Sequence, residues 1–514
     1  MTTASTPRPA TLPATLSATL PTPLPTPLQL AAVDLGSNSF RLEIGRVDGN
    51  RIERQGYWKE TVRLAAGLDD SDRLTKKAIE TACDCLARMN ERLRGFAPEQ
   101  VRAVGTQTLR VARNTNEFLL EAQDALGYPI EIIAGREEAR LVFEGCMHTL
   151  PPTDRRRLVV DIGGASTELI VGRGFTAEAA ESFKLGCVSV SVRFFEDGII
   201  DRARLKRAQV ACSAEIEEAT SAFSRARWDD AFGSSGTVGA VADIFRAEGW
   251  SDGTITAEGL LKLRQILIAA GEIKRIRLAS LKADRQEVIA GGTAILAAVF
   301  ETLGITEMRP ANGALRVGVL YDLLGRRESR DLRDVTVERM QQRFAADRNQ
   351  ALQAAHLANK FFSALQPRAK EELAKRVTWS ALLHEIGFAL SHGDYHKHGA
   401  YLAQHSDMAG FSTTDQEHIA ELILAQRGNL KKVVGLLEDN VRAAQILSLR
   451  LAVILVHARR PVELPHWTLK AGRATIEFAL DRAWLSRHPL TQHLLEEEAE
   501  QWSRVGVRFV LREL

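Results

Sequence analysis

The chain has 514 residues, and since a single hydrophobic core stops growing at about 250 to 300 residues, at least two large domains are expected. Hydrophobic residues make up 45% and charged residues 26%, which is typical of globular proteins and excludes a fibrous or wholly disordered chain. The formal net charge of +2 gives no overall attraction to a polyanion, so we expect no nucleic-acid partner.

The beginning of the chain is rich in Thr, Pro, Leu and Ala, and its prolines interrupt any signal-peptide core. We therefore predict a disordered tail over residues 1–29. No apolar run in the sequence approaches the roughly 20 residues that a membrane-spanning helix needs. The five cysteines form no CxxC pair and are too sparse for a disulfide framework, which favours a cytoplasmic protein and leaves peripheral membrane attachment open.

Two segments match each other position by position, from Val33 to Gly45 and from Val160 to Gly172. Each has a short apolar run, an aspartate (Asp34 or Asp161), a Gly/Ser/Asn turn and a second apolar run, which predicts a β-hairpin with a tight polar loop. Such loops expose backbone N–H groups and hydroxyls that can hold phosphate oxygens. One loop alone would be an ordinary turn, but two loops that face each other could hold a phosphate chain from both sides.

Strands and helices alternate between and after the two repeats, which predicts α/β lobes with layered sheets. After about residue 321 helical patterns take over, and short strands return near the C-terminus. The expected elements are a helix around 79–93, strands at 101–105 and 130–133, helices at 116–126 and 203–223, a glycine-serine loop at 233–237, and strands at 466–470, 474–479 and 505–511.

These motifs resemble those of the exopolyphosphatase and guanosine pentaphosphate phosphohydrolase (Ppx/GppA) family, which has duplicated actin-like lobes of the ribonuclease-H type. The resemblance extends from about residue 31 to the C-terminus. It implies an α/β fold with two actin-like lobes at 30–142 and 143–320, an all-helical HD-like domain at 321–461 and a small C-terminal α+β domain at 462–514. It also implies a homodimer. The matching motifs are Asp34–Leu42, Thr106–Arg110, Gly135–Arg140, Asp161–Leu169, Gly233–Thr237 and Asn312–Arg316.

The resemblance also implies roles for individual residues. Glu138 matches the family's catalytic glutamate, although a glutamate in a first helical turn can simply complement the helix dipole. Carboxylates near phosphates suit Mg²⁺, and the candidate ligands are Asp161, Glu168 and Asp34. The candidate phosphate-binding residues are Gly36, Ser37, Asn38, Ser39, Arg110, Gly163, Gly164, Ala165, Ser166 and Thr167.

Two positions depart from the expected pattern. Ala165 replaces a glycine of the family's second loop, and if its φ were positive the loop would be strained by about 1 kcal/mol. Arg41 occupies the place in the first repeat that corresponds to Glu168 in the second, so the lobes are not equivalent. In the helical region, His384-Glu385 resembles a degraded His-Asp metal motif, and we expect no second metal centre there.

The favoured reaction is processive release of orthophosphate from the end of inorganic polyphosphate. The alternative substrate is guanosine pentaphosphate, which would lose its 5′ terminal phosphate. For a polymer we expect a basic groove in the helical region, with Lys431, Lys432, Arg459 and Arg460 as candidates. Less favoured are an ATP-dependent sugar or acetate kinase, for which no acceptor pocket is evident, and a non-catalytic polyphosphate sensor.

Overall fold

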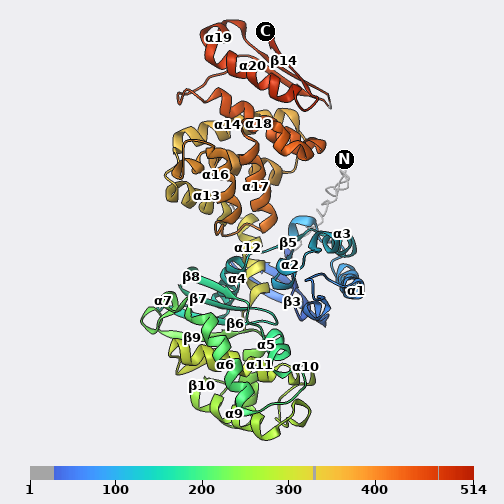
Figure 1. Ribbon diagram of the computed structural model, residues 1–514, viewed down its shortest axis with the longest axis vertical. Helices are drawn as coiled ribbons and strands as arrows, with labels where there is room; N and C mark the ends of the chain where they lie inside the picture. The colour runs from blue at the N-terminus through green and yellow to red at the C-terminus, as the bar shows by residue number, and fades with distance from the viewer. Residues whose placement is uncertain (1–27, 328–330, 473) are drawn as a thin grey trace, which may run out of the picture.

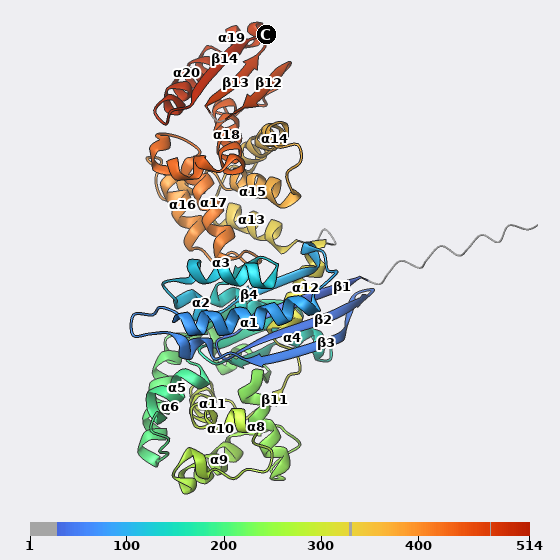
Figure 2. The same ribbon diagram turned by 90° about the vertical axis from the view of Figure 1, so that its right-hand side faces the viewer.

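The computed structural model describes residues 28–327, 331–472 and 474–514. The predicted tail over 1–29 lies outside the described residues except for its last two, and Gln29 is already the first residue of a strand. Two α/β lobes lie at one end of an elongated molecule, a helical region follows, and a small sheet forms the other end (Figures 1 and 2). This is the order of parts that the sequence predicts.

The first lobe contains a five-stranded sheet in the order β3-β2-β1-β4-β5. The first three strands form an antiparallel meander, and β4 and β5 run parallel to β1. Helices α1 and α3 pack together beside this sheet. The bounds are β1 (Gln29–Leu35), β2 (Ser39–Asp48), β3 (Arg51–Thr61), α1 (Lys76–Arg92), β4 (Val101–Gly105), α2 (Gln107–Val111), α3 (Thr115–Leu126) and β5 (Ile130–Ile132).

The second lobe repeats this plan in a six-stranded sheet of order β10-β11-β9-β6-β7-β8. The strands are β6 (Arg157–Ile162), β7 (Thr167–Arg173), β8 (Thr176–Phe183), β9 (Asp230–Ser234), β10 (Ile255–Thr256) and β11 (Glu307–Pro310). The helices are α5 (Cys187–Phe195), α6 (Arg202–Glu217), α7 (Thr220–Phe223), α8 (Ser235–Ala247), α9 (Ala257–Ala270), α10 (Ala283–Gln286) and α11 (Ile289–Leu303).

The apolar runs that mark the two repeats become the central strands β1 and β6. Both are buried almost throughout, since other elements cover both faces of each sheet. Each hairpin is antiparallel as predicted, with Asp34 paired to Arg41 in β1/β2 and Asp161 paired to Glu168 in β6/β7. The repeat therefore places two carboxylates at equivalent strand ends.

Two other predictions need correction. The segment 233–237 is not a loop, because β9 ends at Ser234 and α8 begins at Ser235, which alone takes a left-handed φ of 71°. The predicted helix over 203–223 is two helices, since α6 ends at Glu217 and α7 begins at Thr220.

Two helices join the lobes. Helix α4 (Gly135–Thr149) packs on β7 and β8 of the second sheet, while α12 (Leu315–Arg327) packs on β1 of the first sheet and against α4. Residues of both sheets and both helices share one apolar core. The predicted domain limits after residues 142 and 320 fall inside these two helices, so the exact division of the chain stays a proposal.

The helical region continues into the C-terminal domain through a shared core, in which Phe361 packs edge-on against Trp467 and Phe478. The helices are α13 (Leu332–Arg343), α14 (Arg348–Leu365), α15 (Glu371–Leu382), α16 (Tyr395–His405), α17 (Thr413–Ala425) and α18 (Asn440–Leu455). The last domain contains β12 (Trp467–Ala471), β13 (Thr475–Leu480), α19 (Arg482–Arg487), α20 (Pro489–Ser503) and β14 (Arg508–Glu513).

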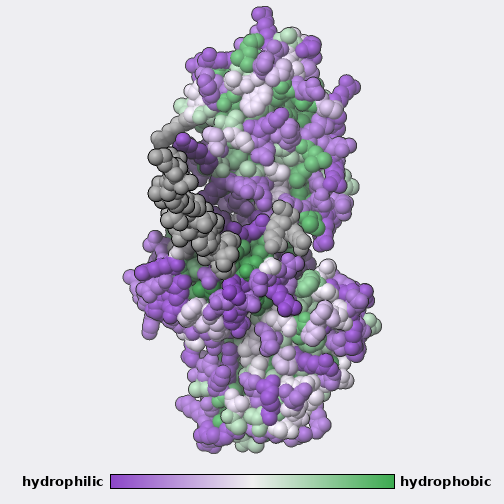
Figure 3. All heavy atoms as spheres, turned by 180° about the vertical axis from the view of Figure 1, so that it is seen from behind, coloured by the Kyte–Doolittle hydropathy of each residue, from purple (hydrophilic) through white to green (hydrophobic). Residues whose placement is uncertain are grey.

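Hydrophilic residues predominate on the face of the molecule that Figure 3 shows. In the parts of the chain that the structure describes, no helix has the length and apolar character that a bilayer span requires. All five cysteines lie in these parts and are free thiols.

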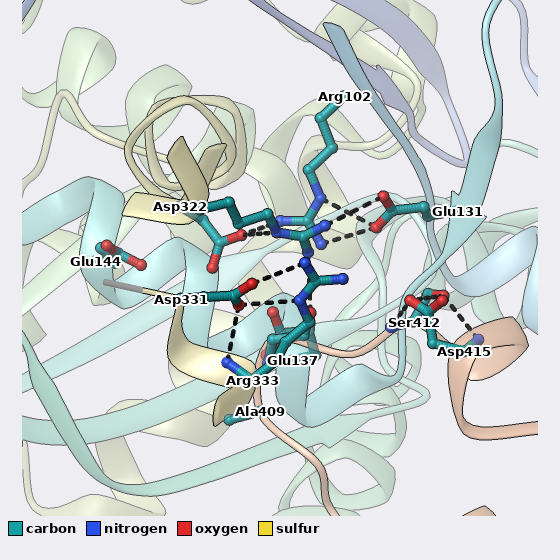
Figure 4. A network of polar contacts seen from close by, with 12 residues as sticks. Arg102, Glu131, Glu137, Glu144, Asp322, Asp331, Arg333, Ala409, Ser412 and Asp415 are labelled. Atoms are coloured by element: carbon teal, nitrogen blue, oxygen red, sulfur yellow. Dashed lines mark hydrogen bonds and ion pairs between the residues drawn. The ribbon is translucent and has the colours of Figure 1, made fainter. Parts of the chain in front are cut away.

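A buried carboxylate connects strand β4 of the first lobe to the joining helices α4 and α12. Asp322 of α12 accepts a hydrogen bond from Arg102 of β4 at 2.7 Å (Figure 4). It also accepts hydrogen bonds from Arg140 of α4 at 2.7 Å and from Arg326 at 2.9 Å. These guanidinium groups hold the pKa of Asp322 well below its usual range, against the opposing effect of burial. The ion cluster fixes both joining helices to the first sheet.

We expect Asp322→Asn to destabilise the protein by about 3 kcal/mol, because it leaves buried guanidinium groups short of negative charge. The thermal unfolding midpoint measures this loss. Arg73→Ala, which breaks an exposed pair with Glu117, is the matched control and should cost no more than about 1 kcal/mol. Equal shifts of the unfolding midpoint in the two variants would show that Asp322 does not stabilise the junction of β4, α4 and α12.

Candidate active site

The two hairpin loops face each other. A Cβ built on Gly164 of the second loop would lie 3.3 Å from the Cβ of Asn38 and 3.6 Å from that of Ser37 in the first. Between the loops is a narrow cleft with a cavity volume of about 60 Å³, room for a few waters or a group of phosphoryl size. The predicted residues that line it are Asp34, Gly36, Ser37, Asn38, Ser39, Glu138, Asp161, Gly163, Gly164, Ala165 and Ser166.

Three predicted residues do not line the cleft directly. Thr167 is fully buried, and its hydroxyl donates to the carbonyl of Leu185, so it stabilises the loop from behind. Glu168 is also fully buried and accepts a hydrogen bond from Ser182 at 2.8 Å. Arg110 does not line the cleft but donates a hydrogen bond to Glu138, which does.

Close packing, and not a left-handed φ, explains the loop glycines. None of Gly36, Gly163 and Gly164 has a positive φ, but a Cβ on Gly36 would lie 2.9 Å from the carbonyl oxygen of Ser39. A Cβ on Gly163 would lie 3.2 Å from that of Ser166. Ala165 has no positive φ either, so alanine fits this position without backbone strain.

Glu138 lies in the first turn of α4 and lines the cleft. It is 7% exposed and pairs with Arg110, which donates from Nη1 to Oε2 at 2.8 Å and is held by Gln107. Burial raises the pKa of Glu138 above its ordinary value, although Arg110 opposes the rise. A fixed, buried carboxylate with a raised pKa has the properties of a general base.

Asp161 contributes a carboxylate to the cleft wall, and Glu168, its partner across the β6/β7 hairpin, is fully buried. Asp161 accepts from the hydroxyl of Ser235 at 2.9 Å, but its Oδ1 and the Oε2 of Glu168 are buried and find no partner among the described residues. Burial raises the pKa of both groups, and the charges of Glu138 and Asp161 raise that of Glu168 further. A hard cation bound here would give both oxygens a partner and would offset the excess negative charge.

Asp34 has a different environment from Asp161. Its Oδ2 accepts from Arg41 at 3.2 Å and from Arg316 at 3.3 Å, and Arg316 also donates to Glu43. Because two guanidinium groups already neutralise Asp34, this predicted metal ligand has less to gain from a cation than Asp161 or Glu168. The cleft thus has a cationic side and an acidic side.

Known proteins are similar to most of this chain in sequence. Residues 46–327 match the Ppx/GppA phosphatase family, and residues 332–499 match domain III of the same family. The chain belongs to the Ppx/GppA phosphatase family.

Relatives in this family match from end to end. The guanosine-5′-triphosphate,3′-diphosphate pyrophosphatase of Aeromonas hydrophila is 37% identical over 93% of this chain and 97% of its own. The protein of the same name from Vibrio vulnificus is 37% identical over 94% of this chain and 97% of its own.

Solved structures confirm the actin-like fold of the lobes. An exopolyphosphatase from Cytophaga hutchinsonii has a TM-score of 0.52 at 23% identity, and covers 58% of this chain and 97% of its own. The Aquifex aeolicus Ppx/GppA member has a TM-score of 0.50 at 23% identity and covers 58% and 98%.

Sequence reasoning assigned no role to several residues that line the cleft, among them Arg285 and Ser235. Arg285 of α10 reaches the cleft by packing on Gly236, where a Cβ would lie 2.3 Å from its Nη2. Ser235 supplies the hydroxyl that holds Asp161. The only sequence signal was the Gly-Ser segment at 233–237, since Arg285 lies in an unremarkable stretch that the fold brings in.

The loop geometry predicts opposite outcomes for two neighbouring substitutions. Gly164→Ala should lower kcat/KM by about tenfold, because the added methyl separates two facing loops whose spacing sets the reacting geometry. Ala165→Gly, the matched control, should stay within about twofold of the parent since no strain is relieved. Increased turnover in Ala165→Gly would contradict the backbone argument.

Proposed function

We propose that this protein removes the terminal 5′-phosphate of guanosine pentaphosphate and releases orthophosphate. As a Ppx/GppA phosphatase it is a hydrolase of phosphoanhydride bonds. Two full-length relatives at 37% identity are named for a guanosine triphosphate diphosphate. The cavity next to the phosphate loops supports the same substrate.

That cavity, of about 920 Å³, shares Ser37 and Asn38 with the narrow cleft. One wall is apolar, with Val192 57% exposed and Ile199 42% exposed. Arg277 and other cations lie on the same cavity, alongside acidic groups. A nucleoside needs apolar surface for its base and cations for its phosphates, whereas a polyphosphate chain needs cations alone. The mixed lining therefore favours a nucleotide substrate.

Inorganic polyphosphate, the substrate that the sequence favoured, becomes the alternative. Some of the cations expected to bind a long chain are already paired within the protein. Arg459 pairs with Glu385 at 2.6 Å and with Asp347 at 3.1 Å. Lys432 donates to the carbonyl of Arg427. The homodimer stays a prediction.

The residues of the cleft have different roles in phosphoryl transfer. Loop N–H groups, with Arg41, Arg285 and Arg316, face the terminal phosphate and offset the negative charge of its oxygens. Glu138 takes a proton from the attacking water, and Arg110 holds its carboxylate in place. Opposed loops keep the terminal phosphate and water in line.

The acidic side fits Mg²⁺, which takes one or two carboxylates, waters and substrate phosphates. Among the described residues no three His, Cys, Asp or Glu side chains converge as a protein-only cage. We propose that Asp161 and Glu168 hold the ion through Oδ1 and Oε2, the oxygens without partners. When bound, Mg²⁺ would neutralise charge on the phosphate oxygens.

Glu138→Gln should reduce turnover by about 10² to 10⁴ while substrate binding and the unfolding midpoint stay near those of the parent. The base must be ionised, and its pKa is raised, so the rate should fall as the pH drops through a value above the roughly 4.3 of an ordinary glutamate. A pH profile of kcat/KM measures both. Near-normal turnover in Glu138→Gln would remove this residue from the mechanism.

Substitutions in the apolar wall of the cavity distinguish the two candidate substrates. Val192→Ser combined with Ile199→Ser should raise KM for guanosine pentaphosphate at least about fivefold, because the base loses apolar contact. The KM for tripolyphosphate should stay unchanged. Orthophosphate release from both substrates measures this, and both positions are exposed, so folding is spared. If the parent enzyme cleaves long polyphosphate far faster than guanosine pentaphosphate, polyphosphate is the substrate.

A further inference from the structure

The helical region adjoins the lobes (Figure 2) and contacts the first lobe close to Glu138, the general base of the proposed function. Residues 406–413, which lead from α16 to the first residue of α17, make this contact, and we call them the docking loop. Thr413 donates its hydroxyl to the carbonyl of Ile132, the last residue of β5, at 3.0 Å. The docking loop therefore reaches the first lobe just before α4 begins.

Gly410 of the docking loop is bonded to both helices that join the lobes. Its backbone N–H donates to the Glu137 carboxylate of α4 at 3.0 Å, and its carbonyl accepts from Arg326 of α12 at 2.9 Å. Gly410 has a left-handed φ of 86°, and a Cβ there would lie 2.9 Å from the Cγ of Arg333. Both observations favour glycine at this position, which lets the backbone approach Glu137 closely.

Glu137 is held by two partners although it lies outside the lining of the cleft. It is 4% exposed, and Arg140 of the next helical turn donates to both of its oxygens at 2.8 Å. Arg140 also donates to Glu144 and to Asp322, so Glu137 is one of three carboxylates around this guanidinium. Because two carboxylates would remain, the charge of Arg140 does not by itself require Glu137.

Glu137 and Glu138 are neighbours in one helical turn but meet different partners. Successive side chains of a helix point about 100° apart, so the two carboxylates lie on different faces of α4. Glu138 lines the cleft, whereas Glu137 meets the docking loop. A shift of the first helical turn moves both side chains together, and a displacement of about 1 Å at a reacting group can cost about 10² in rate. The bond from Gly410 to Glu137 therefore affects where the base lies.

We propose that Glu137 is a positioning residue for Glu138, and that the helical region acts on the reaction by holding Glu137 through the docking loop. The proposal rests on the proposed function, in which Glu138 is the base. Arg110, which holds the Glu138 carboxylate, also donates to the carbonyl of Ile133 at 2.9 Å, next to the docking-loop contact at Ile132. The helical region thus influences the chemistry of the lobes without touching the substrate.

Glu137→Ala tests the proposal in the full chain. The measurement is orthophosphate release from guanosine pentaphosphate or tripolyphosphate, whichever the parent cleaves faster. We expect kcat to fall about tenfold while KM stays within about twofold, because the base is displaced and the phosphate loops are not. Glu137→Gln should recover most of the lost rate, since its amide oxygen can still accept from Gly410.

Glu144→Gln is the matched control, because it also removes a carboxylate from Arg140 in the same helix but does not touch the docking loop. Its kcat should stay within about twofold of the parent. An unchanged kcat in Glu137→Ala, or an equal loss in Glu144→Gln, overturns the proposal.

Thr413→Val applies the same test from the helical region, and it serves if Glu137→Ala does not fold. Valine keeps the shape of threonine but cannot donate to Ile132. We expect kcat to fall at least about threefold with KM unchanged. A parental kcat in this variant contradicts the proposal.

A double-variant cycle separates this proposal from the proposed function. If Glu137 acts through Glu138, then Glu137→Ala combined with Glu138→Gln should stay within about twofold of Glu138→Gln alone. A further loss of about tenfold in the double variant would overturn the positioning role and leave Glu138 as the base. Near-normal turnover in Glu138→Gln would instead refute the proposed base, and the positioning role with it.

Discussion

The buried ion cluster around Asp322 is the constraint on which the rest of the structure depends. One carboxylate holds guanidinium groups from β4, α4 and α12, the three elements that must meet for the lobes to close around a cleft. Its position also fixes the start of α4. Glu137, beside the catalytic candidate Glu138, accepts bonds from Arg140 and from the backbone N–H of Gly410 at 3.0 Å. The first turn of α4 is therefore tied to the helical region as well as to the lobes.

The two lobes share a fold but have opposite electrostatics at the cleft. In the first hairpin Asp34 is paired across the strands with Arg41, and in the second Asp161 is paired with Glu168. Arg41 and Glu168 occupy equivalent positions in the two repeats, so Asp34 has a basic partner across its hairpin and Asp161 has an acidic one. The asymmetry suits a reaction in which the oxygens of a phosphate group require positive charge.

The helical region has kept a cavity where the degraded His-Glu motif lies, but its chemistry differs from that of a metal centre. His384 uses Nδ1 on a backbone carbonyl, and Glu385 is bound by Arg459. The arginines nearby are mostly paired, with Arg450 bound to Glu498, Arg459 to Glu385 and Arg504 near Glu500.

The sequence alone determined the parts that depend on local patterns. The repeated apolar runs and glycine turns predicted both hairpins and put Asp161 at a strand end, whereas Glu138 was identified through the family resemblance. Only the tertiary structure decided the rest. Arg285 and Arg316 line the cleft although they lie far in sequence from both hairpin loops. Helices α4 and α12 each pack across to the other lobe, and Ser235 joins β9 directly to α8. Ala165 was undecidable from sequence because its effect depends on φ, which packing of the loop against the Gly186 segment sets. Charges and glycines show in a sequence which groups exist, but the fold decides which of them meet, because contacts across hundreds of residues leave no periodic trace.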